Sequence, residues 1–235
     1  MLELHLRAFK AVLFDVDGTL VNSRQRILLG LAEGIQNISG YVPSQEEVRR
    51  LIGMSLVDQM RMYAPHATEQ ELEGYVRFTL QRYDFHAAHD EFFTDALQTL
   101  QLCADHNLKT ALVTSKNQDE MVVFLNDFPL RNRLSAVVSA SDVPRPKPAA
   151  DPVLEACLRL SVKPSEALMI GDSVFDVLSA KSAGAASVAV TYGFSDRDTL
   201  AGASPDLILE TPEELLSWAQ ESLKPHATQE TRFNT

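Results

Sequence analysis

Two aspartates, Asp15 and Asp17, follow directly after an apolar, β-prone segment at residues 11–14, and Gly18 and Thr19 come next. The apolar segment predicts a buried parallel strand. Strand alternation would place both carboxylates on the same side, where they would repel each other unless a cation lies between them. The stretch therefore indicates half of a hard-cation site at the carboxyl end of a strand, although a helix N-cap or an Asx-turn uses the same residue types.

Three further groups of polar residues follow later in the chain. Thr114 and Ser115 end one apolar segment, Asp172 ends another, and Asp176 lies one helical turn beyond Asp172. If these strands are neighbours in a parallel sheet, the side chains share one pocket beyond the carboxyl ends. Lys147 could supply one positive charge and Mg²⁺ the rest, because Mg²⁺ accepts carboxylate and phosphate oxygens together. Hydroxyls, an ammonium group and a metal around a carboxylate predict a phosphoryl-transfer site.

Each of these residues also has a purely structural interpretation. Thr114 and Ser115 could cap the helix that follows them, and Asp176 could be an ordinary acidic residue on the surface of its own helix. Lys147 could be a solvated loop residue, with Lys116 as the rival phosphate ligand. Several arginines in the first part of the chain could recognise an anionic substrate, but each alone is more simply a solvated charge: Arg24, Arg26, Arg49, Arg50 and Arg61.

The elements that must position these residues alternate between strands and helices over most of the chain. Apolar periodicity predicts further strands at residues 109–113, 134–139, 167–170, 186–190 and 205–209. It predicts helices between them at residues 92–107, 117–128, 149–160, 175–183 and 212–223, with Gly184 as a C-cap. The pattern predicts an α/β fold with a doubly wound, mostly parallel sheet and helices on both faces.

A helical segment interrupts this alternation after the first strand. Helical periodicity without strand signals occurs at residues 22–39, 45–52, 56–63 and 68–89, with Asn22 and Ser23 as candidate caps. We therefore expect a catalytic core formed by residues 1–20 and 91–223, an inserted α-helical cap domain at residues 21–90, and a flexible tail at residues 224–235.

Composition and charge argue against several classes of protein. The formal charge of −11 disfavours nucleic acid or an anionic membrane as the main partner, and no apolar stretch approaches the length of a membrane span. The N-terminus lacks the pattern of a signal peptide. The two cysteines, Cys103 and Cys157, lie far apart in helix-like segments, which predicts buried free thiols. We expect a cytoplasmic monomer or homodimer that acts on a small molecule.

Together, the motifs resemble those of the haloacid dehalogenase superfamily, specifically its phosphatases with a helical cap inserted after the first motif. The family pattern is a DxDGT stretch, a Thr or Ser ending the second strand, a Lys before a Pro-rich helix start, and a GDxxxD stretch. This chain shows all four in the same order over about residues 10 to 210, with one departure at Ala150, where relatives often have proline. The resemblance implies a Rossmann-like core.

The resemblance also implies chemical roles for the acidic residues. Asp15 would be the nucleophile that forms an aspartyl phosphate, and Asp17 would serve as acid in the first step and base in the second. Mg²⁺ would be held by the Asp15 carboxylate, the Asp17 backbone carbonyl and Asp172. An acid at position 17 favours phosphate chemistry over dehalogenation, because the dehalogenases of the superfamily lack it.

Substrate binding is implied for a second set. Thr114 or Ser115 would hold the phosphoryl oxygens with Lys147, while Asp176 would orient Lys147 or a metal-bound water. The segment around Gly53 resembles the cap segment of phosphoglycolate phosphatases and related pyrophosphatases, so Gly53 would face the substrate and phosphoglycolate is the leading candidate. Pyrophosphate, sugar phosphates and nucleotides remain alternatives, as do an isomerase like β-phosphoglucomutase and a binding protein without activity.

Overall fold

The computed structural model describes residues 4–87 and 90–224. Its centre is a sheet of six parallel strands in the order β5-β4-β1-β6-β7-β8. The strands are β1 (Ala11–Phe14), β4 (Lys109–Val113), β5 (Ala136–Val138), β6 (Ala167–Gly171), β7 (Ala186–Val190) and β8 (Leu207–Leu209). This confirms the predicted doubly wound α/β fold and places β1 between β4 and β6.

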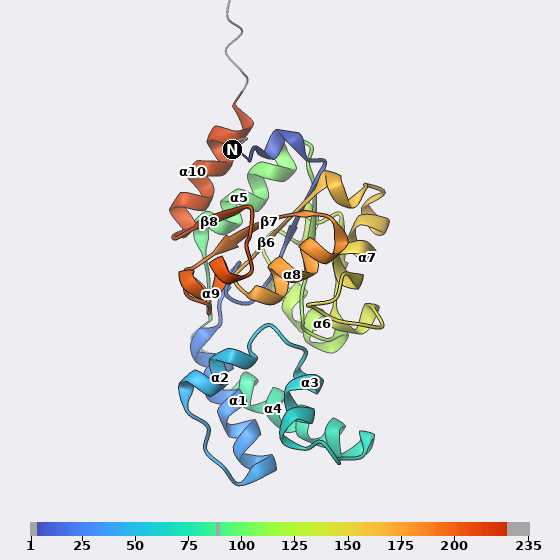
Figure 1. The fold of residues 1–235 in the computed structure, drawn as a ribbon, viewed down its shortest axis with the longest axis vertical. Coiled ribbons are helices and arrows are strands. Elements are labelled where there is room, and N and C mark those ends of the chain that lie inside the picture. The colour runs from blue at the N-terminus through green and yellow to red at the C-terminus, as the bar shows by residue number, and fades with distance from the viewer. Residues whose placement is uncertain (1–3, 88–89, 225–235) are drawn as a thin grey trace, which may run out of the picture.

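Helices cover both faces of the sheet (Figure 1). One face packs against α5 (Thr94–Asp105), α6 (Gln118–Asp127) and α10 (Pro212–Leu223); the other packs against α7 (Asp151–Leu160), α8 (Val174–Ala183) and α9 (Arg197–Gly202). Strand alternation explains the division, because Val12 and Phe14 of β1 point into the first core and Ala11 and Leu13 into the second. All four are fully buried. A strand buried on both faces must be apolar throughout, as this one is.

Four helices follow β1 along the chain before the next strand of the sheet: α1 (Arg24–Ser39), α2 (Gln45–Leu51), α3 (Leu56–Tyr63) and α4 (Glu69–His86). They lie together beneath the sheet in Figure 1 and bury their own apolar cluster. The long helices α1 and α4 pack closely, because a Cβ on Gly34 would lie 2.2 Å from the Thr79 hydroxyl oxygen. We call α1–α4 the inserted helices. The domain boundaries at residues 20/21 and 90/91 stay predictions.

A two-stranded antiparallel ribbon joins the inserted helices to the sheet. It consists of β2 (Val21–Asn22) and β3 (Glu91–Phe92), with Val21 paired to Phe92. The chain therefore leaves the sheet and returns to it at the same place. This ribbon was not predicted, because strands of two residues are too short to show an alternation of apolar and polar residues.

Local capping explains many helix boundaries. The side chains of Ser44, Thr68, Asn117 and Ser173 accept backbone hydrogen bonds at the starts of α2, α4, α6 and α8. Gly184 ends α8 with φ +78°, as predicted. Ser23 occupies the N-cap position of α1 but makes no capping bond through its side chain.

Several other features complete the comparison with the sequence. Short 3₁₀ turns occur at Leu6–Ala8, Arg131–Arg133, Ala140–Asp142 and Pro164–Glu166. The short helix α9 was not predicted. Cys103 and Cys157 are buried free thiols, as expected. The predicted tail beyond Lys224 and the predicted end of the fourth inserted helix at 88–89 lie outside the described residues. Within the described residues, no helix has the length and apolar character needed to cross a membrane.

Candidate active site

The polar residues that follow β1, β4 and β6 meet at one edge of the sheet. Asp15 continues β1, and its backbone N–H donates to the carbonyl of Ile170 at 2.9 Å. The Thr114 N–H donates to Val138 at 3.0 Å in the same way. Asp15, Thr114 and Asp172 consequently line a single cavity of about 60 Å³. Its wall also contains Asp17, Gly53, Ser115, Lys116 and Glu120.

Lys147 lies behind this wall, between two carboxylates. Its Nζ is 2.9 Å from Asp15 Oδ1 and 2.5 Å from Asp176 Oδ1, and the residue is 4% exposed. Burial alone would lower the pKa of Lys147, but the two neighbouring carboxylates outweigh burial and raise it. The ammonium group is therefore a fixed positive charge at Asp15, which excludes the interpretation of Lys147 as a solvated loop residue.

The Asp176 carboxylate is engaged on both oxygens. Besides the contact of Oδ1 with Lys147, Oδ2 accepts from the Ser173 backbone N–H at 3.0 Å and from its hydroxyl at 2.5 Å. Asp176 is 1% exposed, so it is not a surface acid of α8. Its Oδ1 contacts Lys147, one of the two groups that it was expected to orient, the other being a metal-bound water.

Asp15, Asp172 and Asp176 form a buried acidic cluster, in which one carboxylate oxygen from each lies within 4.8 Å of the others. Burial raises the pKa of Asp15 to about 7, against the opposing effect of Lys147. Burial and then repulsion from Asp15 and Asp176 raise the pKa of Asp172 well above its usual range. Both shifts mark a deficit of positive charge, and oxygen donors of this kind fit a hard divalent cation. Because both oxygens of Asp176 already contact Lys147 and Ser173, Asp15 and Asp172 are the carboxylates that could bind such a cation.

Two glycines hold Asp172 in place. A Cβ on Gly18 or on Gly193 would lie 2.2 Å from Asp172 Oδ2, so neither position has room for a side chain. Gly18 also has φ +81°, a conformation that favours glycine. In addition, the backbone N–H of Phe194 donates to Asp172 Oδ2 at 2.6 Å. Neither Gly193 nor Phe194 was predicted to hold Asp172, although both lie in the segment of residues 191–194 that follows β7.

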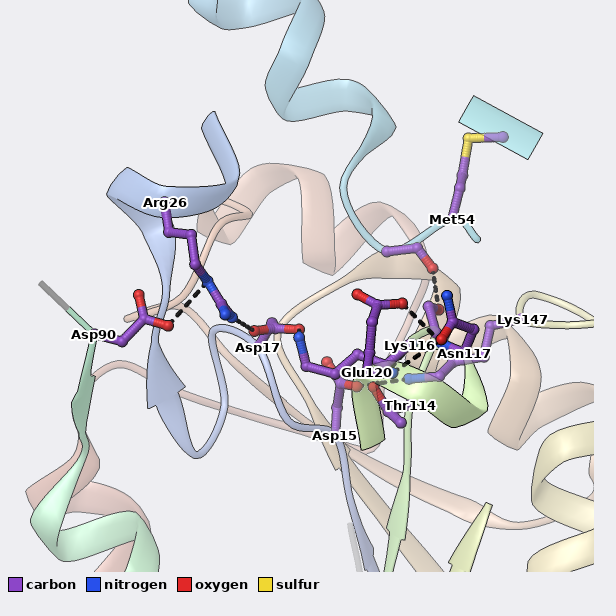
Figure 2. A network of polar contacts seen from close by, with 12 residues as sticks. Asp15, Asp17, Arg26, Met54, Asp90, Thr114, Lys116, Asn117, Glu120 and Lys147 are labelled. Carbon is purple, nitrogen blue, oxygen red and sulfur yellow. Dashed lines mark hydrogen bonds and ion pairs between the residues drawn. The ribbon is translucent and has the colours of Figure 1, made fainter. Parts of the chain in front are cut away.

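The Asp17 side chain turns toward two cations (Figure 2). Lys116 Nζ contacts Asp17 Oδ2, and Arg26 Nη2 lies 3.1 Å from Asp17 Oδ1. The same Arg26 reaches Asp90 Oδ2 at 2.9 Å through Nε. Burial would raise the pKa of Asp17, but Lys116 and Arg26 together outweigh it and lower the pKa to about 2. The carboxylate is outside the acidic cluster, which agrees with the expectation that only its backbone carbonyl serves a metal.

The solvated interpretation of Arg26 is wrong, because this side chain is only 17% exposed. It comes from α1 and bridges Asp17 to Asp90, which lies just before β3. Lys116, the rival phosphate ligand in the sequence analysis, is 8% exposed and lies in the cavity wall. Both basic groups therefore belong to the site.

The inserted helices contact the sheet edge through Gly53. The Ser115 hydroxyl donates to the Gly53 carbonyl at 2.7 Å. Gly53 has φ +100°, and a Cβ there would lie 2.6 Å from the Phe175 ring. The Thr114 hydroxyl accepts from the Lys116 backbone N–H at 3.2 Å. The helix that follows is capped by Asn117, so Thr114 and Ser115 are not its capping residues.

The remaining wall comes from the inserted segment and from α6. Ile52, Met54 and Leu56 belong to the segment around Gly53 that was expected to face the substrate. The helices α1, α3, α4 and α6 add Ile27, Gln59, Tyr83 and Glu120. Burial raises the pKa of Glu120, while Lys116 opposes this shift. The four residues from the helices follow ordinary helical periodicity, and nothing in the sequence distinguishes them from other helix positions.

Comparison with known proteins agrees with this geometry. The family model described as haloacid dehalogenase-like hydrolase matches residues 12–190. The pyrophosphatase PpaX of Bacillus pumilus is 31% identical over 206 residues, which cover 88% of this chain and 94% of that protein. The phosphoglycolate phosphatase of Chromobacterium violaceum is 32% identical over 204 residues, covering 84% and 91%.

Solved structures give the same result. A hydrolase from Pseudomonas syringae superposes with a TM-score of 0.79 at 26% identity and covers 90% of this chain and 98% of its own. A structure described as a predicted phosphoglycolate phosphatase from Haemophilus somnus 129PT has a TM-score of 0.74 at 26% identity and covers 89% and 97%.

Proposed function

The chain belongs to the haloacid dehalogenase-like hydrolases, and from this we propose that it hydrolyses a small phosphate monoester through a phosphorylated Asp15. The observation that carries the proposal is the position of the Asp15 carboxylate. It lies 2.9 Å from the Lys147 ammonium group, in the wall of a cavity that Thr114 and Ser115 also line. These are the groups that an attacked phosphoryl group requires: a nucleophile, a cation and hydrogen-bond donors.

In the first step, an Asp15 oxygen forms a bond to phosphorus and the bond from phosphorus to the leaving oxygen breaks. Lys147 holds Asp15 Oδ1 and so orients the carboxylate for attack. Asp17 gives a proton to the leaving oxygen. In the second step, Asp17 takes a proton from a water that attacks the phosphorus, which releases phosphate and restores Asp15.

Asp17 needs a proton for the first of these roles, although Lys116 and Arg26 keep it ionised in the structure. An incoming phosphoryl group carries negative charge and competes for Lys116. The competition weakens the contact between Lys116 and Asp17 and raises the pKa of Asp17. Lys116 would then bind the phosphoryl group, as the rival interpretation from the sequence suggested.

We infer that the metal is Mg²⁺, held by Asp15, Asp172 and the Asp17 backbone carbonyl. The support is the donor set, which consists of hard oxygen atoms with too little positive charge nearby. When bound, Mg²⁺ would neutralise charge on the phosphoryl oxygens. The chain's own cations at Asp15 and Asp17 would complete this neutralisation.

The relatives' names make phosphoglycolate and pyrophosphate the first compounds to test. The cavity of about 60 Å³ favours a small substrate. The charge of −11 supports action on a small metabolite rather than on nucleic acid, and we infer a cytoplasmic location.

Trapping the phosphorylated enzyme tests the proposal. In Asp17→Asn, an activated aryl ester such as p-nitrophenyl phosphate needs little proton donation, so the first step proceeds while the second loses its base. We expect turnover to fall about 10²–10⁴-fold and one phosphoryl group to accumulate on the peptide that contains Asp15, seen by acid quench and mass spectrometry. Asp15→Asn should be inactive, because an amide is a poor nucleophile.

A matched control is Asp127→Asn, since Asp127 is exposed at the end of α6 and should leave turnover unchanged. A label on Thr114 or Ser115, or normal turnover in Asp15→Asn, would contradict the mechanism.

A further inference from the structure

Gln59 on α3 carries a buried hydrogen-bond acceptor without a partner. The residue is 4% exposed, and its Nε2 donates to the carbonyls of Leu51 at 2.9 Å and Met54 at 3.2 Å. Over residues 4–87 and 90–224, no group donates to the other amide atom, Oε1. Rotating the amide by half a turn would set Oε1 against two carbonyl oxygens, so the two bonds fix the orientation. A buried acceptor left unpaired is destabilising and calls for an explanation.

Gln59 lies in the wall of the cavity that holds Asp15 and Asp172. The other side chains that the inserted helices contribute there are aliphatic, thioether or aromatic: Ile27, Ile52, Met54, Leu56 and Tyr83. Among the described residues, the inserted helices place no charged side chain in this wall. Gln59 is thus a polar group among mostly apolar side chains of the inserted segment, in the cavity that Asp15 and Asp172 also line. Such an arrangement is typical of a group that orients a small ligand.

We propose that Gln59 Oε1 accepts a hydrogen bond from a hydroxyl of the leaving alcohol, so that the enzyme selects small phosphate monoesters with a second hydroxyl. The inference rests on the proposed function, because it places the phosphoryl group at Asp15. It makes Gln59 a specificity-determining residue of the inserted helices.

The charges around the cavity argue against a carboxylate at the same position. A leaving group such as that of phosphoglycolate would bring its anion next to the Gln59 acceptor. The wall also contains the Glu120 carboxyl, and Lys116, the one described cation in that wall, contacts Asp17 and would be drawn to the phosphoryl group rather than to the leaving group. An anion there would meet acceptors rather than donors, which costs binding free energy.

Three substrates with the same two-carbon chain test the inference on the unmodified enzyme: 2-hydroxyethyl phosphate, ethyl phosphate and phosphoglycolate. With Mg²⁺ present, we expect kcat/KM to be about tenfold higher for 2-hydroxyethyl phosphate than for ethyl phosphate. This is the expected effect of one hydrogen bond to an acceptor that has no partner when ethyl phosphate is bound. Phosphoglycolate should be poorer than ethyl phosphate. Equal rates for the hydroxyl and methyl compounds, or phosphoglycolate as the best of the three, would overturn the inference.

The variant Gln59→Met keeps the length of the side chain but removes the acceptor. Its loss of the bonds to Leu51 and Met54 lowers activity on every substrate, so the readout is the ratio between 2-hydroxyethyl and ethyl phosphate. We expect that ratio to fall to about one. Gln70→Met, at an exposed position on α4, is the matched control and should keep the ratio of the unmodified enzyme.

A ratio of about ten that persists in Gln59→Met would overturn the role of Gln59. If Gln59→Met does not fold, the three substrates on the unmodified enzyme still decide whether a hydroxyl is selected. Failure of the proposed function looks different: the unmodified enzyme would then neither cleave p-nitrophenyl phosphate nor form a phosphorylated Asp15.

Discussion

Replacing Gly193 by alanine should disable the site without altering any proposed catalytic or metal-binding residue. The added Cβ would lie 2.2 Å from Oδ2 and 2.4 Å from the Cβ of Asp172, whereas ordinary contacts begin at 3.4 Å. Rotation of the Asp172 side chain cannot relieve the second contact, because a Cβ is fixed to its backbone. The backbone at Asp172 or Gly193 must therefore move by about 1 Å.

The displacement sets the magnitude. A misplacement of about 1 Å at a catalytic group lowers the rate about 10²-fold, equivalent to about 2.7 kcal/mol of transition-state stabilisation. Disturbing a group that orients a metal ligand lowers metal affinity about 10–100-fold. We therefore expect Gly193→Ala to lose about 10²-fold in kcat/KM and about 10–100-fold in Mg²⁺ affinity.

The assays are p-nitrophenyl phosphate hydrolysis with saturating Mg²⁺ and calorimetric titration of Mg²⁺. Overpacking also destabilises by about 1–3 kcal/mol, so circular dichroism at the assay temperature must show a folded protein. Gly74→Ala is the matched control, because Gly74 lies in α4 and an added Cβ there would meet no atom within 4 Å. It should keep full activity and gain up to about 1 kcal/mol of stability. Activity of folded Gly193→Ala within twofold of the unmodified enzyme would refute the reasoning.

Two further predictions concern the acidic cluster. Chelation should abolish hydrolysis of p-nitrophenyl phosphate and Mg²⁺ should restore it, whereas Ca²⁺ should inhibit because it prefers more ligands and looser geometry; full activity with no metal retained would contradict this. In chelator, Asp172→Asn should unfold at a temperature no lower than the unmodified protein. Burial and the neighbouring carboxylates raise the pKa of Asp172, so above the usual pKa of aspartate the folded state loses stability by burying or protonating this group, and asparagine avoids that cost. Lys147→Met should unfold earlier, with a loss of about 3–5 kcal/mol, because it leaves Asp15 and Asp176 unpaired. Equal destabilisation of the two variants in a thermal melt would show that the cluster's charge balance is misassigned.

The sequence was sufficient to predict the sheet and the residues on its edge. Residues 11–14, 111–113 and 167–170 are apolar on both strand faces, and the polar residues that follow them lie next to each other because the strands do. Each of these positions depends on local pattern and on one topological rule. The position of Lys147 was implied by the resemblance to the family and not by strand order, and a solvated loop residue remained an alternative from the sequence alone.

Contacts between the inserted helices and the core could not be predicted in this way. Arg26 is a charged residue on an amphipathic helix, and only the docking of α1 brings it to Asp17 and Asp90. Gln59 reads as a polar position on a short helix, and its burial depends on the turn between α2 and α3. The contact of Arg26 with Asp90 joins residues far apart in sequence, whereas the others are local. All of them depend on how helices and turns dock against each other, which the periodicity of one segment does not contain.

The ribbon of β2 and β3 has a consequence for how the chain folds. Pairing Phe14 with Leu112 closes a loop of about 100 residues, but once Val21 has paired with Phe92 the effective loop is only about 30 residues. The difference corresponds to about 1 kcal/mol of loop-closure entropy. Once the ribbon has formed, the inserted helices no longer lengthen the loop that must close before β1 and β4 can pair. A segment of different length or sequence could replace them there at little entropic cost, which makes this junction a natural site for exchanging specificity.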